Sequence, residues 1–230
     1  MQLFLLLVIL NLTVLDSYEI FQTQLSDVLQ YYPNLIVKTN DNKQYIKGIL
    51  DIPNSKGNIV NSYLIEIRWK KMFPYRFPEL YEFGTIPCGD DWHKYEDNSC
   101  CITVEPEEII TCKNGITVLS FIRRQVIPYL ANQSYKLITG VYKDEFPHGI
   151  EGYRMFYAEL MKTADSRKWI QYADFAFNGM AGKLERNKPC FCGSGVKYKR
   201  CHDKVFEKIR LIGKESVKQH FILLINKENL

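Results

Sequence analysis

The chain has 230 residues, of which 46% are hydrophobic and 13% aromatic. This length and composition exclude a disordered or fibrous protein and suffice for one good core with a small appended module. The charge is uneven: residues 183–230 hold twelve Lys and Arg against five Asp and Glu, a net charge of +7, whereas the remaining 182 residues sum to −3. A basic C-terminal segment is typical of a surface that meets nucleic acid or an acidic partner, although a solvated face has the same composition.

The N-terminal stretch MQLFLLLVILNLTVL is apolar and uncharged. It is shorter than the roughly 20 residues that span a bilayer, and it lacks the basic start and small-residue cleavage site of a signal peptide. We therefore expect that this stretch does not span a membrane. It is either a buried first helix or the product of a start codon placed upstream of the functional one. A signal peptide is the less favoured alternative. The odd count of seven cysteines does not indicate a disulfide framework and favours a reducing, cytoplasmic compartment.

A helix and an antiparallel set of strands are predicted first along the chain. Apolar spacing predicts a helix over residues 16–32, ended by Pro33. The runs NLIVK, YIKGILDI and SYLIEIRW are β-branched and aromatic, and the turn clusters TNDNK and PNSKGN separate them, which predicts an antiparallel meander. The proline-rich segment that follows is predicted to hold one short edge strand from Leu80 to Glu82.

Helices are predicted to dominate the rest of the chain. Residues 89–115 show little periodicity and are predicted to form a long, structured loop. A second helix is predicted over 115–132, and Pro128 should kink or shorten its last turn. Further helical stretches are expected after the Pro-His-Gly of 147–149, over 167–177 and over 204–226, the last as one helix or two.

The most specific local pattern is CFCGSGVKYKRCH. Cys190 and Cys192 are followed, after eight intervening residues, by Cys201 and His202. Three thiolates and one imidazole suit tetrahedral zinc, and the two glycines between the ligand pairs permit the tight turn that brings them together. Four protein ligands leave no open position, so we expect a structural zinc that supplies much of the folding free energy of so small a module.

This string resembles the SEC-C zinc motif, a short element best known at the C-terminus of the SecA translocation motor. The resemblance covers the ligands, the Gly-Ser-Gly turn and the Lys-Tyr-Lys-Arg run, so part of the basic tail belongs to the motif itself. It implies a structural zinc and a protein-docking surface.

The middle of the chain holds two adjacent cysteines, Cys100 and Cys101, in DWHKYEDNSCCITVEPE. The order of helix, meander, proline-rich run, His-then-Cys loop and second helix resembles the ubiquitin-conjugating enzyme family over about residues 16–132, with a variable helical extension to about 162. YLIEI with FPYRFPELYE is similar to that family's third strand and proline-rich run, SCCITV to its active-site stretch, and NGITVLSFIRRQVIPYL to the helix that follows.

The two resemblances together imply an α+β chain with three parts. Residues 1–165 would form a ubiquitin-conjugating-like domain, 166–188 a helix and linker, and 189–230 the SEC-C motif with a helical tail.

Within the family resemblance, Cys101 is the implied nucleophile. Ile102 takes the place of the hydrophobic residue that follows the family's catalytic cysteine, and Cys100 becomes its packed neighbour. The implied chemistry is transthiolation followed by acyl transfer, in which an amine attacks the acyl group held on the sulfur. His93 lies near the place of the family's His-Pro-Asn motif and either structures the loop or transfers protons.

The chain departs from the family directly after His93, where Lys94 and Tyr95 follow and Pro-Asn is missing. The family's asparagine steadies the oxyanion; here Asn98, Ser99 or backbone N–H groups are the candidate donors.

Three further side chains, one histidine and two cysteines, have the chemistry of site residues. His148 belongs either to a helix-start turn or, as in some bacterial relatives with a similar His-Gly element, to a second wall of the active-site groove. Cys88 and Cys112 have no partner at ligand spacing and are expected to be small buried residues.

Three functions from different classes remain open. The favoured one is a bacterial ubiquitin-conjugating-like enzyme, of the kind found in antiphage operons of the cyclic-oligonucleotide signalling type (CBASS). Its partners would be a protein that supplies a C-terminal acyl group, either a cGAS-like nucleotidyltransferase or a ubiquitin-like protein, and an amine-bearing protein acceptor. No adenylating domain is recognisable, so the acyl group must arrive activated or a partner must activate it.

The missing Pro-Asn favours a second function, an inactive binding module of the same fold. A nucleic-acid-binding protein that uses the zinc element and basic tail is the least favoured, because the body is slightly acidic.

Overall fold

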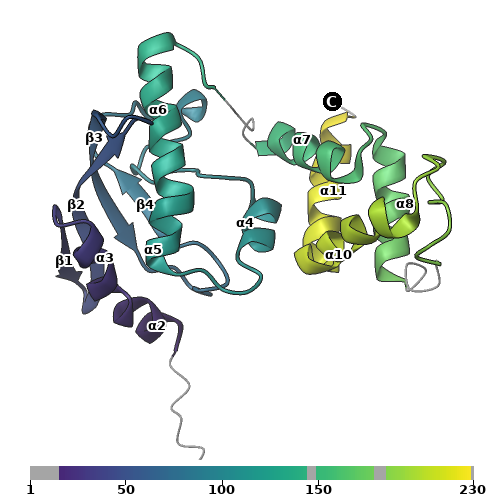
Figure 1. The fold of residues 1–230 in the computed structure, drawn as a ribbon, viewed down its shortest axis with the longest axis horizontal. Coiled ribbons are helices and arrows are strands. Elements are labelled where there is room, and N and C mark those ends of the chain that lie inside the picture. Colours follow the sequence, from purple (N-terminus) through teal and green to yellow (C-terminus); the bar gives the residue numbers. More distant parts are fainter. Residues whose placement is uncertain (1–15, 144–148, 179–184, 229–230) are drawn as a thin grey trace, which may run out of the picture. The chain divides into compact units, whose positions relative to one another are not determined.

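The computed structural model describes residues 16–143, 149–178 and 185–228, with side chains to residue 225 (Figure 1). These residues form two compact units. The first comprises residues 16–87, Asp97–Cys100 and Gly115–Ser134. The second comprises Cys88–Glu96, Cys101–Asn114 and the described residues from Tyr135 onward. Cys101 and the C-terminal cysteine motif therefore belong to the same unit, and the boundaries expected near residues 165 and 188 stay predictions.

Two short helices open the first unit, α2 (Ser17–Thr23) and α3 (Leu25–Tyr31). The side chain of Asp16 caps α2, because it accepts hydrogen bonds from two backbone amides of the first turn. The expectation of one unbroken helix is wrong, since the chain turns at Gln24 between them. The Gln24 side chain accepts a hydrogen bond from the backbone amide of Val118, 2.9 Å away, and this tertiary contact leaves no trace in local periodicity.

An antiparallel meander follows, which confirms the predicted strands and the α+β class. Its strand order is β1-β2-β3-β4, with β1 (Leu35–Asn40), β2 (Lys43–Pro53), β3 (Ile59–Arg68) and the edge strand β4 (Glu79–Glu82). Close approach of β1 requires a glycine in β2, because a Cβ at Gly48 would lie 2.1 Å from the Asn34 carbonyl oxygen.

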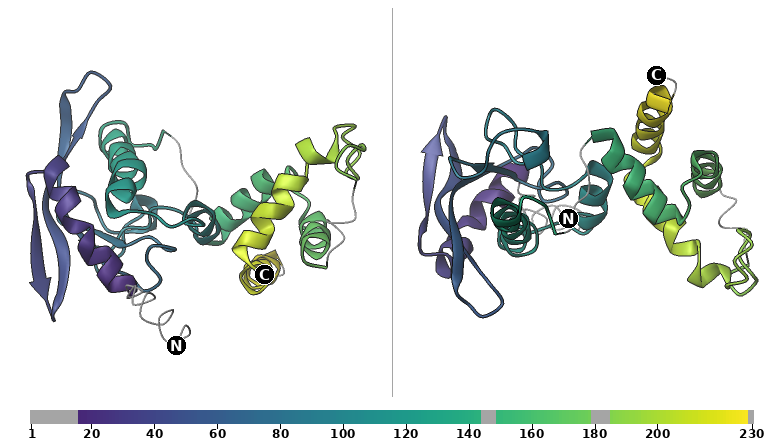
Figure 2. Two further views of the ribbon diagram at one scale, coloured as in Figure 1. Left: turned by 60° about the horizontal axis from the view of Figure 1, so that its bottom comes forward. Right: turned by 90° about the horizontal axis from the view of Figure 1, so that it is seen from above.

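One face of the sheet carries the core of the first unit. Apolar side chains alternate along the two central strands and are fully or almost fully buried: Ile46, Leu50 and Ile52 on β2, and Tyr63, Ile65 and Ile67 on β3. Figure 2 shows α3 against this sheet, and α3 also packs on the helix that begins at Val118. The phenol of Tyr63 is hydrogen-bonded to Ser134 Oγ at 2.7 Å, so the polar end of this buried ring is satisfied.

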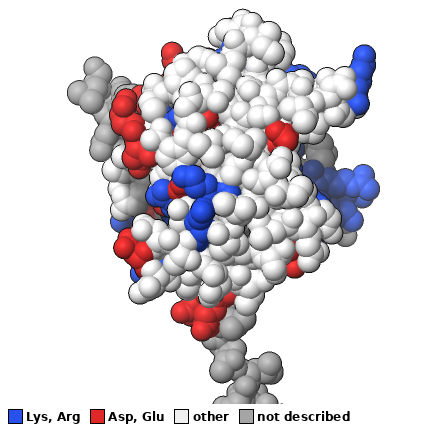
Figure 3. Space-filling model, turned by 90° about the vertical axis from the view of Figure 1, so that its left-hand side faces the viewer, with Lys and Arg blue, Asp and Glu red and all other residues white. Residues whose placement is uncertain are grey.

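The opposite face of the sheet holds a charged cluster around Glu66. This side chain is 3% exposed, accepts a hydrogen bond from Lys47 Nζ at 2.9 Å and pairs with Arg68. Burial raises the pKa of Glu66, but the two cations outweigh it and hold that pKa below its usual range. Figure 3 shows one face of the molecule that is largely uncharged, with a small group of basic side chains near its middle.

The helix predicted over residues 115–132 is longer in the structure. It runs through α5 (Val118–Phe121), a π-helical turn (Ile122–Val126) and α6 (Ile127–Thr139). Pro128 does not end it, because the π turn lies directly upstream, where the Ile127 amide donates to the Ile122 carbonyl five residues back. A change of register at this point accommodates a proline that has no N–H to donate.

A helix that was not predicted lies in the second unit. The stretch expected to be loop contains a 3₁₀ turn (η1, Asp90–Trp92) and α4 (Glu105–Thr111), which packs on α7 and α10. Its seven residues are too few for a periodic signal, but Pro106 in the first turn, among acidic side chains, is typical of a helix start.

The remaining helices of the second unit share one apolar core. They are α7 (Gly149–Met161), α8 (Ser166–Phe177), η3 (Tyr198–Arg200), α10 (Asp203–Ile212) and α11 (Lys214–Glu228). Gly213, with φ +92°, separates the last two, so the C-terminal stretch is two helices. Trp169 and Phe206 lie at the centre of the core and are at most 1% exposed. None of the helices within the described ranges has the length and apolar content needed to cross a bilayer, and the apolar N-terminal stretch lies outside those ranges.

Candidate functional site

A tight turn between α8 and α10 carries the predicted zinc ligands. The Cys190 amide donates to the Val196 carbonyl at 2.7 Å and closes the turn. Gly193 and Gly195 have φ values of +79° and +71° inside it, a region that side-chain-bearing residues adopt only with strain. The sequence thus provides glycine where the backbone must reverse to bring the first ligand pair back toward the second.

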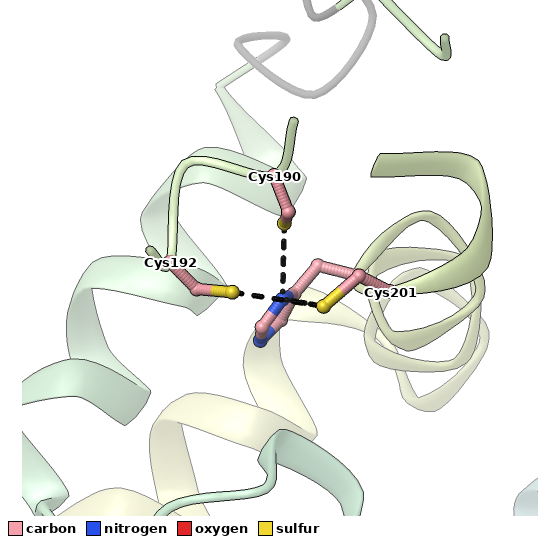
Figure 4. Close-up of side chains that lie close together, drawn as sticks. Cys190, Cys192 and Cys201 are labelled. Atoms are coloured by element: carbon pink, nitrogen blue, oxygen red, sulfur yellow. Dashed lines mark hydrogen bonds between the residues drawn. The ribbon is translucent and has the colours of Figure 1, made fainter. Parts of the chain in front are cut away.

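The four predicted ligands meet at one point (Figure 4). One ligand atom from each of Cys190, Cys192, Cys201 and His202 lies within 4.8 Å of all the others. Cys192 Sγ is 3.6 Å from Cys201 Sγ, and His202 Nδ1 is 3.3 Å from Cys190 Sγ. A tetrahedral zinc bonded at about 2.3 Å to sulfur and about 2.0 Å to nitrogen separates its ligand atoms by roughly 3.5–3.8 Å. The cluster therefore fits a zinc ion, and three thiols with one imidazole match the ligand preference of that metal.

The electrostatics of the cluster also suit a cation. Burial raises the pKa of Cys192, but hydrogen bonds from Ser194 and the neighbouring thiols outweigh it and lower that pKa to about 7. Burial raises the pKa of Cys190 to about 11, so this thiol keeps its proton in the absence of metal. A bound cation would displace that proton, because only the thiolate is a metal ligand. Ser194 Oγ lies 3.2 Å from Cys192 Sγ and 3.5 Å from Cys201 Sγ. Sequence reasoning missed this residue, and its position between the two glycines was the available signal.

Aromatic rings enclose the imidazole of His202. Its ring centroid is 4.8 Å from that of Tyr172, 5.3 Å from that of Phe191 and 6.1 Å from that of Phe206. Burial lowers the pKa of His202, which favours the neutral form that binds metal. These rings join the motif to α8 and α10, so the cluster is built into the helical core of the second unit.

Cys101 occupies a half-buried position just before α4. Its backbone amide donates to the His93 carbonyl at 2.8 Å, and its Sγ lies 4.0 Å from the Thr103 carbonyl. Burial raises the pKa of the Cys101 thiol, a hydrogen bond with Tyr95 opposes this effect, and the Glu108 carboxylate adds to it. The net direction is upward, so the thiol is mainly protonated at neutral pH.

His93 contacts Cys101 through its backbone. The residue ends η1 in the left-handed region, with φ +51°, and its carbonyl holds the Cys101 amide. Its imidazole packs edge-on against Tyr142, with ring centroids 5.2 Å apart. This arrangement suits the loop-structuring role of His93, and proton transfer by its imidazole stays a prediction.

The other predicted site residues are Asn98 and His148. Asn98 and Cys100 belong to the first unit, where the Asn98 carbonyl accepts a hydrogen bond from the Glu82 amide and the Cys100 amide donates to the Leu80 carbonyl. Oxyanion stabilisation by Asn98 stays a prediction. His148 lies outside the described residues.

The two remaining cysteines differ from each other. Cys112 is fully buried at the end of α4, as predicted. The expectation for Cys88 is wrong, because this side chain is exposed. It stands between Pro87 and Gly89, in a stretch that the structure describes as neither helix nor strand.

The charge on Glu108 provides a test of the environment of Cys101. Glu108→Gln removes a negative charge that disfavours the thiolate, so Cys101 should ionise at lower pH. We expect the pH midpoint of iodoacetamide alkylation at Cys101, followed by mass spectrometry, to fall and the alkylation rate near neutral pH to rise. Glu107→Gln, in the same turn of α4, is the matched control. A midpoint that rises or stays unchanged in Glu108→Gln would contradict this environment.

Comparison with known proteins finds a match at the C-terminal motif. Residues 186–203, which include all four clustered ligands, match the SEC-C motif. A stretch of 79 residues, 34% of this chain, is 35% identical to the protein translocase subunit SecA of Cupriavidus metallidurans. That stretch corresponds to 8% of the SecA protein, so the chain spans less than a tenth of the length of this curated relative. The chain thus carries a SEC-C motif whose ligand set is compatible with zinc.

Proposed function

We propose that this protein is a cysteine-dependent acyl carrier of the ubiquitin-conjugating type, with Cys101 as the acyl-bearing residue and a structural zinc in its SEC-C motif. The observation that carries the proposal is the setting of Cys101. It follows an antiparallel four-stranded meander along the chain, its backbone amide donates to the His93 carbonyl, and its half-buried thiol lies just before α4. The order of elements supports a ubiquitin-conjugating-like fold.

The proposed reaction has two acyl transfers. The Cys101 thiolate attacks the carbonyl carbon of an activated C-terminus; a sulfur–carbon bond forms, and the donor's thiolate or other leaving group departs with its electron pair. An acceptor amine then attacks the thioester carbonyl, a nitrogen–carbon bond forms, and the sulfur–carbon bond breaks. The amine proton is lost, and Cys101 is regenerated as a thiol.

The proposed acyl donor is a protein C-terminus that has already been activated. A cGAS-like nucleotidyltransferase or a ubiquitin-like protein would supply it, an amine-bearing protein would accept it, and antiphage defence in a bacterial cytoplasm is the proposed setting. The resemblance of the segments around Cys101 supports this choice, and the zinc motif is assigned a structural role because all four of its ligands come from the protein.

A gel without reductant tests the proposal. Tagged full-length chain is recovered from its own host under acidic, non-reducing conditions, with and without dithiothreitol. We expect a heavier, dithiothreitol-sensitive species in the unmodified protein and in Cys100→Ala, and its complete loss in Cys101→Ala. The same species in Cys101→Ala, or its loss in Cys100→Ala alone, would contradict the assignment.

One observation favours a second function, a binding module of the same fold without chemistry. Burial and Glu108 raise the pKa of Cys101, and a thiol in such a setting is a poor nucleophile unless something promotes its ionisation. Under this alternative, Cys101→Ala and Cys100→Ala both keep full biological activity, whereas the acyl-carrier function requires Cys101.

A further inference from the structure

A buried histidine joins three helices of the second unit. His220 lies on α11 and is 2% exposed. Its Nδ1 is 2.8 Å from the hydroxyl of Tyr157 on α7, and its Nε2 is 3.3 Å from a carboxylate oxygen of Glu105, the first residue of α4. The ring of Tyr153, also on α7, lies against the imidazole, with centroids 4.4 Å apart. The imidazole therefore connects α4 with α7 and α11 through both of its nitrogens.

The two hydrogen bonds of His220 share one direction. Burial raises the pKa of Tyr157, so its phenol keeps the proton and donates it to Nδ1. A neutral imidazole that accepts at Nδ1 carries its own proton at Nε2. That proton is donated to the carboxylate of Glu105, whose side chain is 39% exposed. A hydrogen bond to a charged acceptor is stronger than one between neutral groups, so this contact is a firm hold on the start of α4.

Glu105 is close to Cys101 along the chain. Three residues separate them, and Cys101 Sγ lies 4.0 Å from the carbonyl of Thr103, the middle one of the three. Val104, directly before the helix, and Ile109 within it pack against the helical core of the second unit. So short a connection cannot move independently of the helix. The position of α4 therefore decides how deeply the Cys101 thiol is buried.

We propose that His220 is a positioning residue for Cys101. Its hydrogen bond to Glu105 holds α4 against α7 and α11 and so keeps the Cys101 thiol half-buried. This inference deepens the proposed function, and its importance for acyl transfer rests on that function. It makes the C-terminal helix, which follows the SEC-C motif along the chain, a part of the surroundings of Cys101.

Two substitutions of His220 separate the roles of its nitrogens. An asparagine amide reaches about as far as Nδ1 and a glutamine amide about as far as Nε2, and each amide can donate or accept. His220→Asn keeps a partner for Tyr157 but does not reach Glu105, whereas His220→Gln keeps the hydrogen bond to Glu105. Glu105→Ala removes the same hydrogen bond from a partly exposed position, without a change in the buried core.

Hydrogen exchange and alkylation, both followed by mass spectrometry, test the inference on the full chain with Cys100→Ala. In His220→Asn and in Glu105→Ala we expect the amides of α4 to exchange about tenfold faster, the factor that the loss of a hydrogen bond to a charged group implies. The pH midpoint of iodoacetamide alkylation at Cys101 should fall, because the thiol becomes more exposed. His220→Gln should stay close to the parent protein in both measurements.

Controls separate this effect from a general loss of stability and from a change in charge. Glu107→Ala removes another carboxylate from the same turn of α4 and should leave both measurements unchanged. Exchange in β2 and β3 should be the same in every variant, because these strands belong to the first unit. The double variant of His220→Asn and Glu105→Ala should be no faster than the single variants, since each removes the same hydrogen bond. If His220→Asn fails to fold, Glu105→Ala and its control decide the question.

Three results would overturn the inference: an unchanged Cys101 midpoint in Glu105→Ala, additive effects in the double variant, or a His220→Gln variant that behaves like His220→Asn. None of these measurements requires acyl transfer. A lowered midpoint in a protein that forms no dithiothreitol-sensitive adduct would reject the proposed function and keep the role of His220, whereas an adduct with an unshifted midpoint would do the reverse.

Discussion

Cys201→Ala should release the metal and destabilise the whole second unit. Cys201 Sγ lies within 3.6 Å of both Cys192 Sγ and His202 Nδ1, so its loss leaves three ligands and an incomplete tetrahedron. When the free zinc concentration is about a thousand times the dissociation constant, binding stabilises the folded state by about 4 kcal/mol. We therefore expect zinc content to fall from one ion per chain to near zero, and the melting temperature of this unit to fall by more than about 10 °C.

Metal analysis and circular dichroism at 222 nm measure these two effects on the same samples. Cys88→Ala is the matched control, because Cys88 is an exposed thiol in the same unit and outside the cluster. Chelation of the unmodified protein should reproduce the thermal effect of Cys201→Ala. Stoichiometric zinc in Cys201→Ala, or a chelator-resistant melting temperature with zinc removed, would contradict a structural metal at this cluster.

Phe206→Ala should have the second largest effect, because Phe206 connects the cluster to the helical core. Its ring is fully buried, stacks on Phe191 with centroids 5.8 Å apart and lies 6.1 Å from the His202 ring. Truncation of a buried phenylalanine costs about 3–5 kcal/mol. Support of a metal ligand by its neighbours is worth about 10–100-fold in metal affinity, so we expect a loss of that size in a zinc competition assay.

Phe206→Leu is the control for this prediction, since it keeps most of the buried volume. It should cost about 1.5 kcal/mol or less and leave zinc affinity close to that of the unmodified protein. A large stability loss in Phe206→Ala with unchanged zinc affinity would show that the cluster and the helical core are energetically separate. That result would contradict a motif built into the core of the second unit.

Features whose causes are local could be predicted from the sequence. The meander follows from alternating β-branched residues between turn clusters, and the zinc cluster follows from four ligands and two glycines within thirteen residues. The split of the C-terminal stretch into two helices follows from Gly213, although the sequence alone left one or two helices open.

Features that depend on distant partners could not be predicted in this way. The break at Gln24 is accompanied by a hydrogen bond from the Val118 amide, and α4 gains its stability by packing on α7 and α10. The aromatic rings around His202 likewise come from α8, from the cysteine turn and from α10.

The central claim is that Cys101 carries an acyl group, and peptide mass spectrometry of the protein isolated from its own host tests it most directly. Digestion at acidic pH keeps thioesters intact, and neutral hydroxylamine cleaves them. We predict a peptide in which the Cys101 sulfur is joined to the C-terminal carboxyl of another polypeptide, and its loss after hydroxylamine. An unmodified Cys101 in every isolated molecule, or an adduct that resists hydroxylamine, would contradict the acyl-carrier account.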